Sequence, residues 1–228
     1  MRLILVRHGE PNYQLDCLTE FGRRQAEAAA LRLADEKITK IYSSDLGRAK
    51  ETAACIAAPH GLEVTELSYM RELGWHATEG EELPHRGHPW LLANDIVAEG
   101  GDIHSQSFAS EEPFRRNNAT ARAALVGEGI DALLAEYGYR REGKYYRVER
   151  ECRDTILIAS HGGSSSALIA HVFGLPFPFV TATMCPAFTS ITVLNFKGEE
   201  GKLIIPHLES FNDYRHIIGL TGEMGFGT

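Results

Sequence analysis

The chain has 228 residues, and its 31 acidic against 23 basic residues give a formal charge of −8. This length predicts one or two domains with a substantial core, and a composition of 43% hydrophobic and 24% charged residues is typical of soluble globular proteins. An acidic chain without a basic block is a poor match to nucleic-acid-binding proteins. No apolar stretch reaches the roughly 18 residues of a membrane span, and the N-terminal apolar run is too short for a secretory signal. We therefore expect a soluble, cytoplasmic protein that binds neither nucleic acid nor a membrane.

The first half of the chain alternates apolar strands with amphipathic helices. Residues 3–6 form a short apolar run that ends at an Arg-His-Gly-Glu cluster, as a central strand does when it delivers a loop to a site. Thr19 is suited to cap a helix whose apolar residues, from Ala26 to Leu33, recur at helical spacing. A second strand is expected over residues 38–42, and the Ser-Ser-Asp at 43–45 is expected to start another helix.

The second half repeats this alternation. Residues 155–159 predict a buried strand that runs into Ser-His-Gly-Gly and a helical pattern, and residues 188–196 predict a further strand. The alternation predicts an α/β fold, a three-layer α/β/α sandwich with a mostly parallel central sheet. Ligands bind such sheets at the carboxyl ends of the strands, and two strands here end on His-Gly, at His8 and at His161.

Residues from about 81 to 150 fit this alternation badly. Prolines and glycines interrupt the first part, a long helix is expected at about 117–137, and residues 139–148 predict a hairpin that turns at Glu142 and Gly143. We expect a single domain over residues 1–228, with residues 81–150 as a lid-like insertion that covers the strand ends.

The Arg-His-Gly at residues 7–9 has the composition of a phosphoryl-transfer site. An imidazole is a neutral nitrogen nucleophile near pH 7 and can accept a phosphoryl group, while Arg7 offers a planar fork for phosphate oxygens. Arg48 falls in the first turn of a helix, where a cation opposes the helix dipole, and an anionic ligand shared with the helix start would explain its place. Taken alone, each residue also has a purely structural interpretation: a histidine that bonds its own loop, and an arginine that faces solvent.

Five groups of residues, taken in chain order, carry a joint signature. They are Arg7-His8-Gly9-Glu10; Leu18-Thr19 with Gly22 and Gln25-Ala26; Ser43-Ser44-Asp45-Leu46 with Arg48-Ala49 and Thr52-Ala53; Ser160-His161-Gly162-Gly163; and Ser190–Leu194 with Phe211–Asp213 and His216. Together they resemble the histidine phosphatase superfamily, the phosphoglycerate-mutase-like group of phosphatases and mutases. The resemblance spans nearly the whole chain except residues 81–150.

The resemblance implies that His8 is the nucleophile and forms a phosphohistidine. It also implies that Arg7, Arg48 and His161 form a positive pocket around the phosphoryl group, which suits a reaction that mainly needs fixed positive charge around the equatorial oxygens. These residues can supply that charge without a metal or cofactor. The arginines are expected to disfavour protonation of His8, and a carbonyl at Gly9 or beyond is expected to orient its ring.

The acid–base residue of this family precedes a Gly…Glu-Gly signature. Counting back eight residues from Gly80 leads to Glu72, which would protonate the leaving oxygen and then activate water, a role that a raised pKa helps. Glu79 is a weaker candidate. His76 stands where the family usually has glycine, so the geometry of this loop departs from the pattern.

Further phosphate ligands are expected at the backbone of Gly162 and at the side chains of Asn12 and Gln14. Gln14 stands where the mutases have an asparagine, and their longer signature is absent, so we favour a phosphatase over a mutase. A binding module without catalysis is the third alternative, but such a module could dispense with the nucleophile or the acid, and both are present. The expected partner is a small phosphorylated metabolite; sugar phosphates, cofactor precursors and phosphoproteins stay open, as does the oligomeric state.

Other chemistries find less support. A metal site could be formed by histidines and aspartates between residues 76 and 104, but their spacing is irregular and we expect surface or lid histidines instead: His76, His85, His88, His104, Asp95 and Asp102. The four cysteines form no Cys-x-x-Cys pair, which argues against a zinc cluster or a disulfide framework: Cys17, Cys55, Cys152 and Cys185. The sequence also lacks a Gly-x-Ser-x-Gly elbow and a P-loop, which argues against serine esterases and P-loop nucleotidases.

Overall fold

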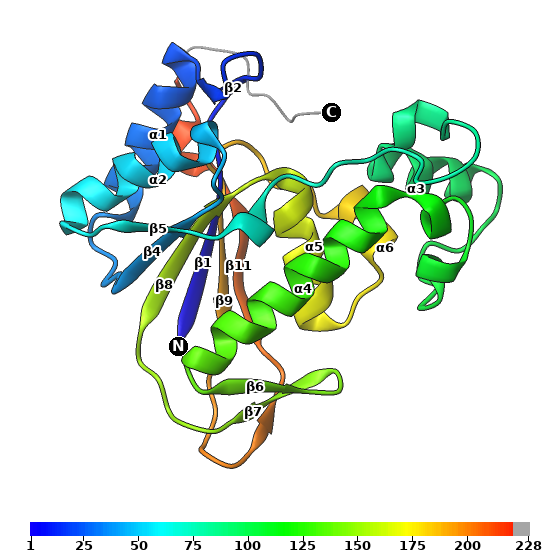
Figure 1. Ribbon diagram of the computed structural model, residues 1–228. Coiled ribbons are helices and arrows are strands. Elements are labelled where there is room, and N and C mark those ends of the chain that lie inside the picture. The colour runs from blue at the N-terminus through cyan, green and yellow to red at the C-terminus, as the bar shows by residue number, and fades with distance from the viewer. Residues whose placement is uncertain (221–228) are drawn as a thin grey trace.

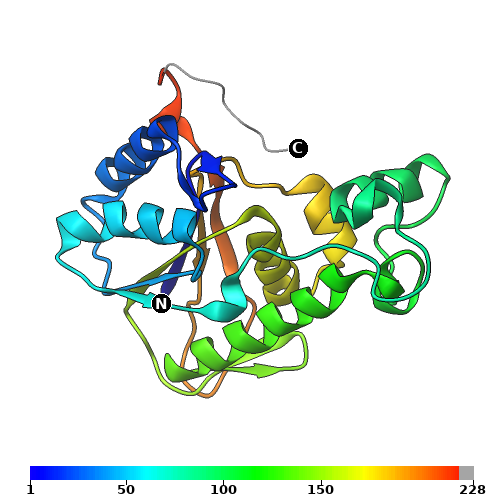
Figure 2. The same ribbon diagram turned by 45° about the horizontal axis from the view of Figure 1, so that its top comes forward.

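The computed structural model describes residues 1–220, in which a central sheet carries helices on both faces (Figures 1 and 2). Strands β1, β8, β4 and β5 pair in parallel in that order, whereas β9 pairs antiparallel with both β1 and β11. This arrangement confirms the expected three-layer α/β/α sandwich with a mostly parallel sheet. In sheet order the strands are β11 (His207–Asp213), β9 (Ile191–Asn195), β1 (Arg2–Arg7), β8 (Thr155–Ser160), β4 (Lys40–Ser43) and β5 (Val64–Glu66).

The central strand β1 is buried on both faces, because its side chains alternate between two apolar clusters. Leu3 and Leu5 pack into the larger cluster, which lies under α4 (Asn118–Glu136), α5 (Gly162–Phe173) and α6 (Phe177–Thr183). Ile4 and Val6 pack into the other cluster, under α1 (Glu20–Leu33) and α2 (Gly47–His60). Both helical layers therefore pack against β1, the strand that directly precedes His8. Within residues 1–220, no helix is long and apolar enough to cross a membrane.

The helices α1 and α2 begin in different ways. Thr19 caps α1 as expected, since its hydroxyl accepts the Gly22 amide at 2.9 Å. The Ser-Ser-Asp at 43–45 does not start α2, because Leu46 is its N-terminal cap and offers no side-chain acceptor. The Gly47 amide instead donates to Asp16, 2.7 Å away, in the loop between β2 (Pro11–Asn12) and β3 (Cys17–Leu18).

The segment 81–150 divides into two parts with different locations. Its first part holds α3 (Pro89–Ala98) and three 3-10 turns (Pro84–Gly87, Phe108–Ser110 and Phe114–Arg116), and α3 packs beside α6. The hairpin of β6 (Tyr139–Glu142) and β7 (Tyr145–Val148) instead pairs with β10 (Leu203–Ile204), below the start of β1 in Figure 1.

The hairpin therefore cannot cover the carboxyl ends of the strands, and that part of the expectation is wrong. Its position follows from its aromatic side chains, since Tyr139 and Tyr146 are buried against Phe196, with ring centroids 5.4 and 5.5 Å away. The turn falls at residues 143–144, one residue later than expected, because Glu142 pairs with Tyr145.

Candidate active site

His8 follows the carboxyl end of β1 and is 1% exposed. Its Nδ1 donates to the Gly9 carbonyl at 2.7 Å, the kind of orienting contact expected from the sequence, and this leaves the lone pair on Nε2. Burial, with the charges of Arg7 and Arg48 acting in the same direction, holds the pKa of His8 well below its usual range. The ring is therefore neutral at pH 7, and its unprotonated Nε2 can attack an electrophile.

Close backbone contacts fix the loop that carries His8. A Cβ atom on Gly9 would lie 2.4 Å from the Gly22 carbonyl oxygen, so the loop and the first turn of α1 meet backbone to backbone. The Gly9 amide also donates to the Thr52 hydroxyl of α2 at 3.1 Å. Both helices of this layer thus position the histidine.

Arg7 is a buried cation without a carboxylate partner in the part of the chain that the structure describes. Its Nη1 donates to the Pro186 carbonyl at 2.7 Å, and its guanidinium lies 4.3 Å from the centre of the Phe188 ring. Its Nε is buried and has no hydrogen-bond partner among these residues. A desolvated cation is costly unless an anion compensates it, so Arg7 is suited to hold an anionic ligand.

Arg48 lies in the first turn of α2, and its Nε donates to His8 Nε2 at 3.4 Å. The sequence predicts an anionic ligand here, but the structure shows an anionic side chain instead: Asp16 contacts Arg48 Nη1 at 2.5 Å and also accepts the Gly47 amide. The carboxylate offsets the unfavourable helix dipole and holds Arg48 beside the histidine. Asp16 is not predictable from its own sequence context, and the unusual position of Arg48 is the one signal for it.

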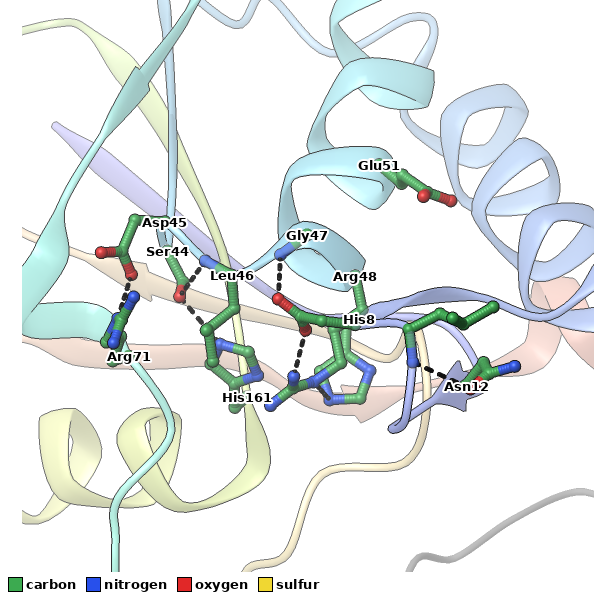
Figure 3. Close-up of polar contacts among 12 residues, drawn as sticks. His8, Asn12, Ser44, Asp45, Leu46, Gly47, Arg48, Glu51, Arg71 and His161 are labelled. Carbon is green, nitrogen blue, oxygen red and sulfur yellow. Dashed lines mark hydrogen bonds and ion pairs between the residues drawn. The ribbon is translucent and has the colours of Figure 1, made fainter.

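His161 is fully buried beside His8, with ring centroids 5.0 Å apart, and Figure 3 shows both rings and Arg48 gathered at the start of α2. Burial, followed by the repulsion that a protonated His8 and the arginines exert on a second positive charge, holds the pKa of His161 well below its usual range. This direction favours a neutral ring, which can take part in a phosphate pocket as a hydrogen-bonding group. A positive charge on His161 stays a prediction.

The His161 ring has one hydrogen-bond partner among the described residues, Ser44. The Ser44 hydroxyl lies 2.8 Å from His161 Nε2 and accepts the Leu46 amide at 3.3 Å. In the tautomer in which that hydroxyl donates its proton to Nε2, the ring N–H lies on Nδ1. That Nδ1 is buried and lacks a partner among the described residues, so in this tautomer it can donate to a ligand.

Glu72 lies at the start of α5, where its Oε1 accepts the amides of Leu73 at 2.9 Å and Ser164 at 3.2 Å. Burial raises the pKa of this carboxyl above its usual range, and the hydrogen bonds and arginines only partly oppose the rise. A carboxyl in this state can hold a proton for donation. The weaker candidate, Glu79, is exposed and pairs with Arg115 at 2.8 Å.

The three further phosphate ligands expected from the sequence differ in their positions. Asn12 Oδ1 accepts the amides of Gln14 and Leu15 at 3.1 and 3.2 Å, so it closes its own loop, and Gln14 is exposed. The contacts of the described residues bring neither side chain to His8. Gly162 opens α5, and a Cβ atom there would lie 3.5 Å from the Arg7 guanidinium carbon. Phosphate binding at these three positions stays a prediction.

The histidines of residues 76–104 are dispersed in the structure. His85 pairs with Asp95 at 2.8 Å, and the His104 ring stacks on Phe179 with centroids 4.6 Å apart. The His88 ring packs against both Trp75 and Trp90. Over residues 1–220, no three His, Cys, Asp or Glu side chains are grouped so that they could hold a metal ion.

Comparison with known proteins gives a consistent result. A model of the histidine phosphatase superfamily, branch 1, matches residues 3–206. A probable phosphoglycerate mutase of Yersinia enterocolitica is 33% identical over 150 residues, which are 60% of this chain and 70% of that protein.

Solved structures share the fold. A mycobacterial glucosyl-3-phosphoglycerate phosphatase is 27% identical, with a TM-score of 0.63 over 92% of this chain and 98% of its own. A phosphoserine phosphatase mutant of Entamoeba histolytica, in complex with phosphoserine, gives a TM-score of 0.64 at 24% identity over 95% and 98%.

Proposed function

Since this chain belongs to the histidine phosphatase superfamily, we propose that it hydrolyses a small phosphomonoester through a phosphohistidine on His8. The observation that carries this proposal is the neutral His8, whose Nε2 holds the ring lone pair and receives a long contact of 3.4 Å from the buried Arg48. Arg7 has no carboxylate partner among the described residues, and Glu72, with its raised pKa, lines one cavity together with Arg7. Nucleophile, anion-binding cations and acid are therefore available together.

In the first step, His8 Nε2 attacks phosphorus, the N–P bond forms and the bond to the leaving oxygen breaks. Arg7 and Arg48 stabilise the charge on the equatorial oxygens, and the N–H of His161 donates to one of them. Protonated Glu72 gives its proton to the leaving oxygen, so the product departs as a neutral alcohol.

In the second step, water attacks the phosphohistidine. Glu72, now ionised, accepts a proton from that water, while the N–P bond breaks and inorganic phosphate forms. His8 returns to its neutral state with the lone pair on Nε2, because Nδ1 has kept its hydrogen bond to Gly9 throughout.

The test is hydrolysis of p-nitrophenyl phosphate in excess EDTA by the wild type and by His8→Ala. We expect activity that survives chelation and is abolished by the substitution, together with an acid-labile phosphoenzyme in rapid-quench samples of the wild type alone. His207→Ala, an exposed histidine on β11, is the matched control and should keep full activity. Retained turnover in His8→Ala would remove His8 from its role, and loss with EDTA would favour a metal-dependent phosphatase.

Mutase activity is the second candidate, supported by the probable phosphoglycerate mutase among the relatives. Interconversion of 3- and 2-phosphoglycerate without net release of phosphate would establish it. A phosphate-binding module is the third candidate, and phosphate binding without turnover of any ester would favour it. The presence of both His8 and Glu72 favours catalysis over binding alone.

A further inference from the structure

The cavity of about 380 Å³ that contains Arg7 and Glu72 has an aromatic wall. If the proposed function holds, the phosphoryl group binds at Arg7 and the leaving oxygen faces Glu72, so the rest of the substrate occupies this cavity. Its volume is in the range of small-ligand pockets. The side chains around it therefore bear on the substrate class.

Three rings make up one side of this cavity. Trp75 lies three residues after the acid Glu72, and its ring meets Trp90 edge to face with centroids 5.0 Å apart. The His88 ring lies 4.7 Å from Trp75 and 4.9 Å from Trp90. All three side chains are half-buried, so each still presents surface to the cavity.

A fourth ring lines the cavity from a separate segment. Tyr13, in the loop between β2 and β3, lies with its ring centre 5.4 Å from the Arg48 guanidinium carbon. It is 68% exposed, which is unusual for an aromatic side chain that serves only packing. Aromatic surface thus lines the cavity from two segments of the chain.

The cavity offers little to a second anionic group. Arg7 is the one arginine or lysine among the described residues that line it, and the proposed function assigns Arg7 to the phosphoryl group. His88 adds no charge at pH 7, because burial, with His85 and Arg86 nearby, lowers its pKa. A substrate carboxylate would therefore enter the cavity without a counter-ion, which is costly.

Two other arginines of the same insertion are already paired: Arg115 lies 2.8 Å from Glu79, and Arg116 lies 3.1 Å from Glu112. Arg86 is exposed and does not line the cavity. The rings therefore make up most of the surface that could distinguish one alcohol from another.

From this juxtaposition we infer that the substrate is a phosphomonoester of an alcohol that carries an uncharged planar ring, which packs face to face on one of Trp75 and Trp90 and edge to face on the other. This inference rests on the proposed function, because it takes the place of the leaving group from the roles of Arg7 and Glu72. It distinguishes this chain from an enzyme for phosphoserine or phosphoglycerate, whose leaving groups carry a carboxylate.

The experiment compares kcat/KM for 2-phenylethyl phosphate, n-butyl phosphate, phosphoserine and 3-phosphoglycerate, all of which have an alkyl leaving oxygen. We expect 2-phenylethyl phosphate to exceed each of the others by roughly tenfold, the combined effect of stacking on two rings. Trp75→Leu and Trp90→Leu should each lower kcat/KM for this ester severalfold more than for n-butyl phosphate. Arg86→Gln, an exposed cation on the same insertion, is the control and should leave this preference unchanged.

Several outcomes overturn the inference while the proposed function stands: equal rates on the phenylethyl and butyl esters, or a preference for either carboxylate-bearing substrate. If instead the proposed function fails, no ester is hydrolysed, including p-nitrophenyl phosphate. In that case binding of 2-phenylethylphosphonate and n-butylphosphonate by calorimetry still tests the ring preference. Tighter binding of the phenylethyl compound supports the inference, and equal binding rejects it.

Discussion

Glu72 shows how a catalytic requirement opposes stability at the scale of one residue. The folded-state pKa of the half-buried Glu72 lies above the unfolded value because its carboxyl is desolvated, so its favourable contribution is complete below the unfolded pKa and is lost as the pH rises through the folded pKa. Glu72→Gln stays neutral and keeps an oxygen for the amides of Leu73 and Ser164. We therefore expect the variant to match the wild type in Tm at about pH 4 and to exceed it at about pH 8.

Thermal unfolding followed by circular dichroism at both pH values measures this difference. Glu79→Gln provides the control, since Glu79 is exposed and its carboxylate forms a surface ion pair with Arg115. Glu79→Gln should not exceed the wild type in Tm at either pH. A lower Tm for Glu72→Gln than for the wild type at about pH 8 would contradict the raised pKa.

The site residues that could be predicted from the sequence are those whose side chains are typical of phosphoryl transfer. His8, Arg48 and His161 are placed by strand ends and a helix start, and the structure brings them together. Asp16 and Phe188 could not be predicted, because their contacts depend on how two loops fold over the strand ends. The helix dipole suggested an anionic ligand at the start of α2, and the structure shows that a carboxylate of the chain itself occupies this position.

At the scale of the element, the start of α5 is shaped around Glu72. A Cβ atom on Gly163 would lie 2.6 Å from Glu72 Oε1, so Gly163→Ala should displace the carboxyl group. Helix propensity favours alanine, so the fold should persist while proton donation suffers. We expect kcat/KM for an alkyl phosphate to fall about a hundredfold, and for p-nitrophenyl phosphate much less, because its leaving oxygen hardly needs a proton.

Ser165→Ala is the matched control on the same helix. The Ser165 hydroxyl is buried without a hydrogen-bond partner among the described residues, so its removal should leave both rates unchanged. Equal losses on the two esters in Gly163→Ala would argue that the substitution disturbs phosphate binding and that Glu72 is not the acid.

Elements with their own periodicity could be predicted well, and those without it could not. The buried run of β1, the cap of α1 at Thr19 and the strand β8 match the sequence pattern because burial on both faces leaves a continuous apolar run. Strand β5 spans only Val64–Glu66 at the sheet edge and has no such run, so its sequence gives no signal. The start of α2 was mispredicted because its cap comes from Asp16, far along the chain.

At the scale of the whole molecule, the residues of the proposed site and a cluster that stabilises the fold lie at opposite ends of the sheet. The site lies at the carboxyl end of β1, whereas the hairpin of β6 and β7 lies at the other end, where the Met1 amine donates to Tyr139 at 3.2 Å. Sequence analysis could not make this distinction within residues 81–150, because a hairpin's pattern does not specify which end of the sheet it packs against. The buried faces of Tyr139 and Tyr146 determine it.

Tyr146→Ala should therefore destabilise the protein without changing its catalysis. Tyr146 is fully buried, packs on Phe196 and donates to Asp131 at 2.8 Å, and its truncation should cost about 3–5 kcal/mol of unfolding free energy. Tyr145→Ala, its 51% exposed neighbour, should change stability by less than about 0.5 kcal/mol. Urea unfolding measures both, and kcat/KM for p-nitrophenyl phosphate under native conditions should match the wild type in each. A loss of kcat/KM in folded Tyr146→Ala would mean that the two ends of the sheet are coupled.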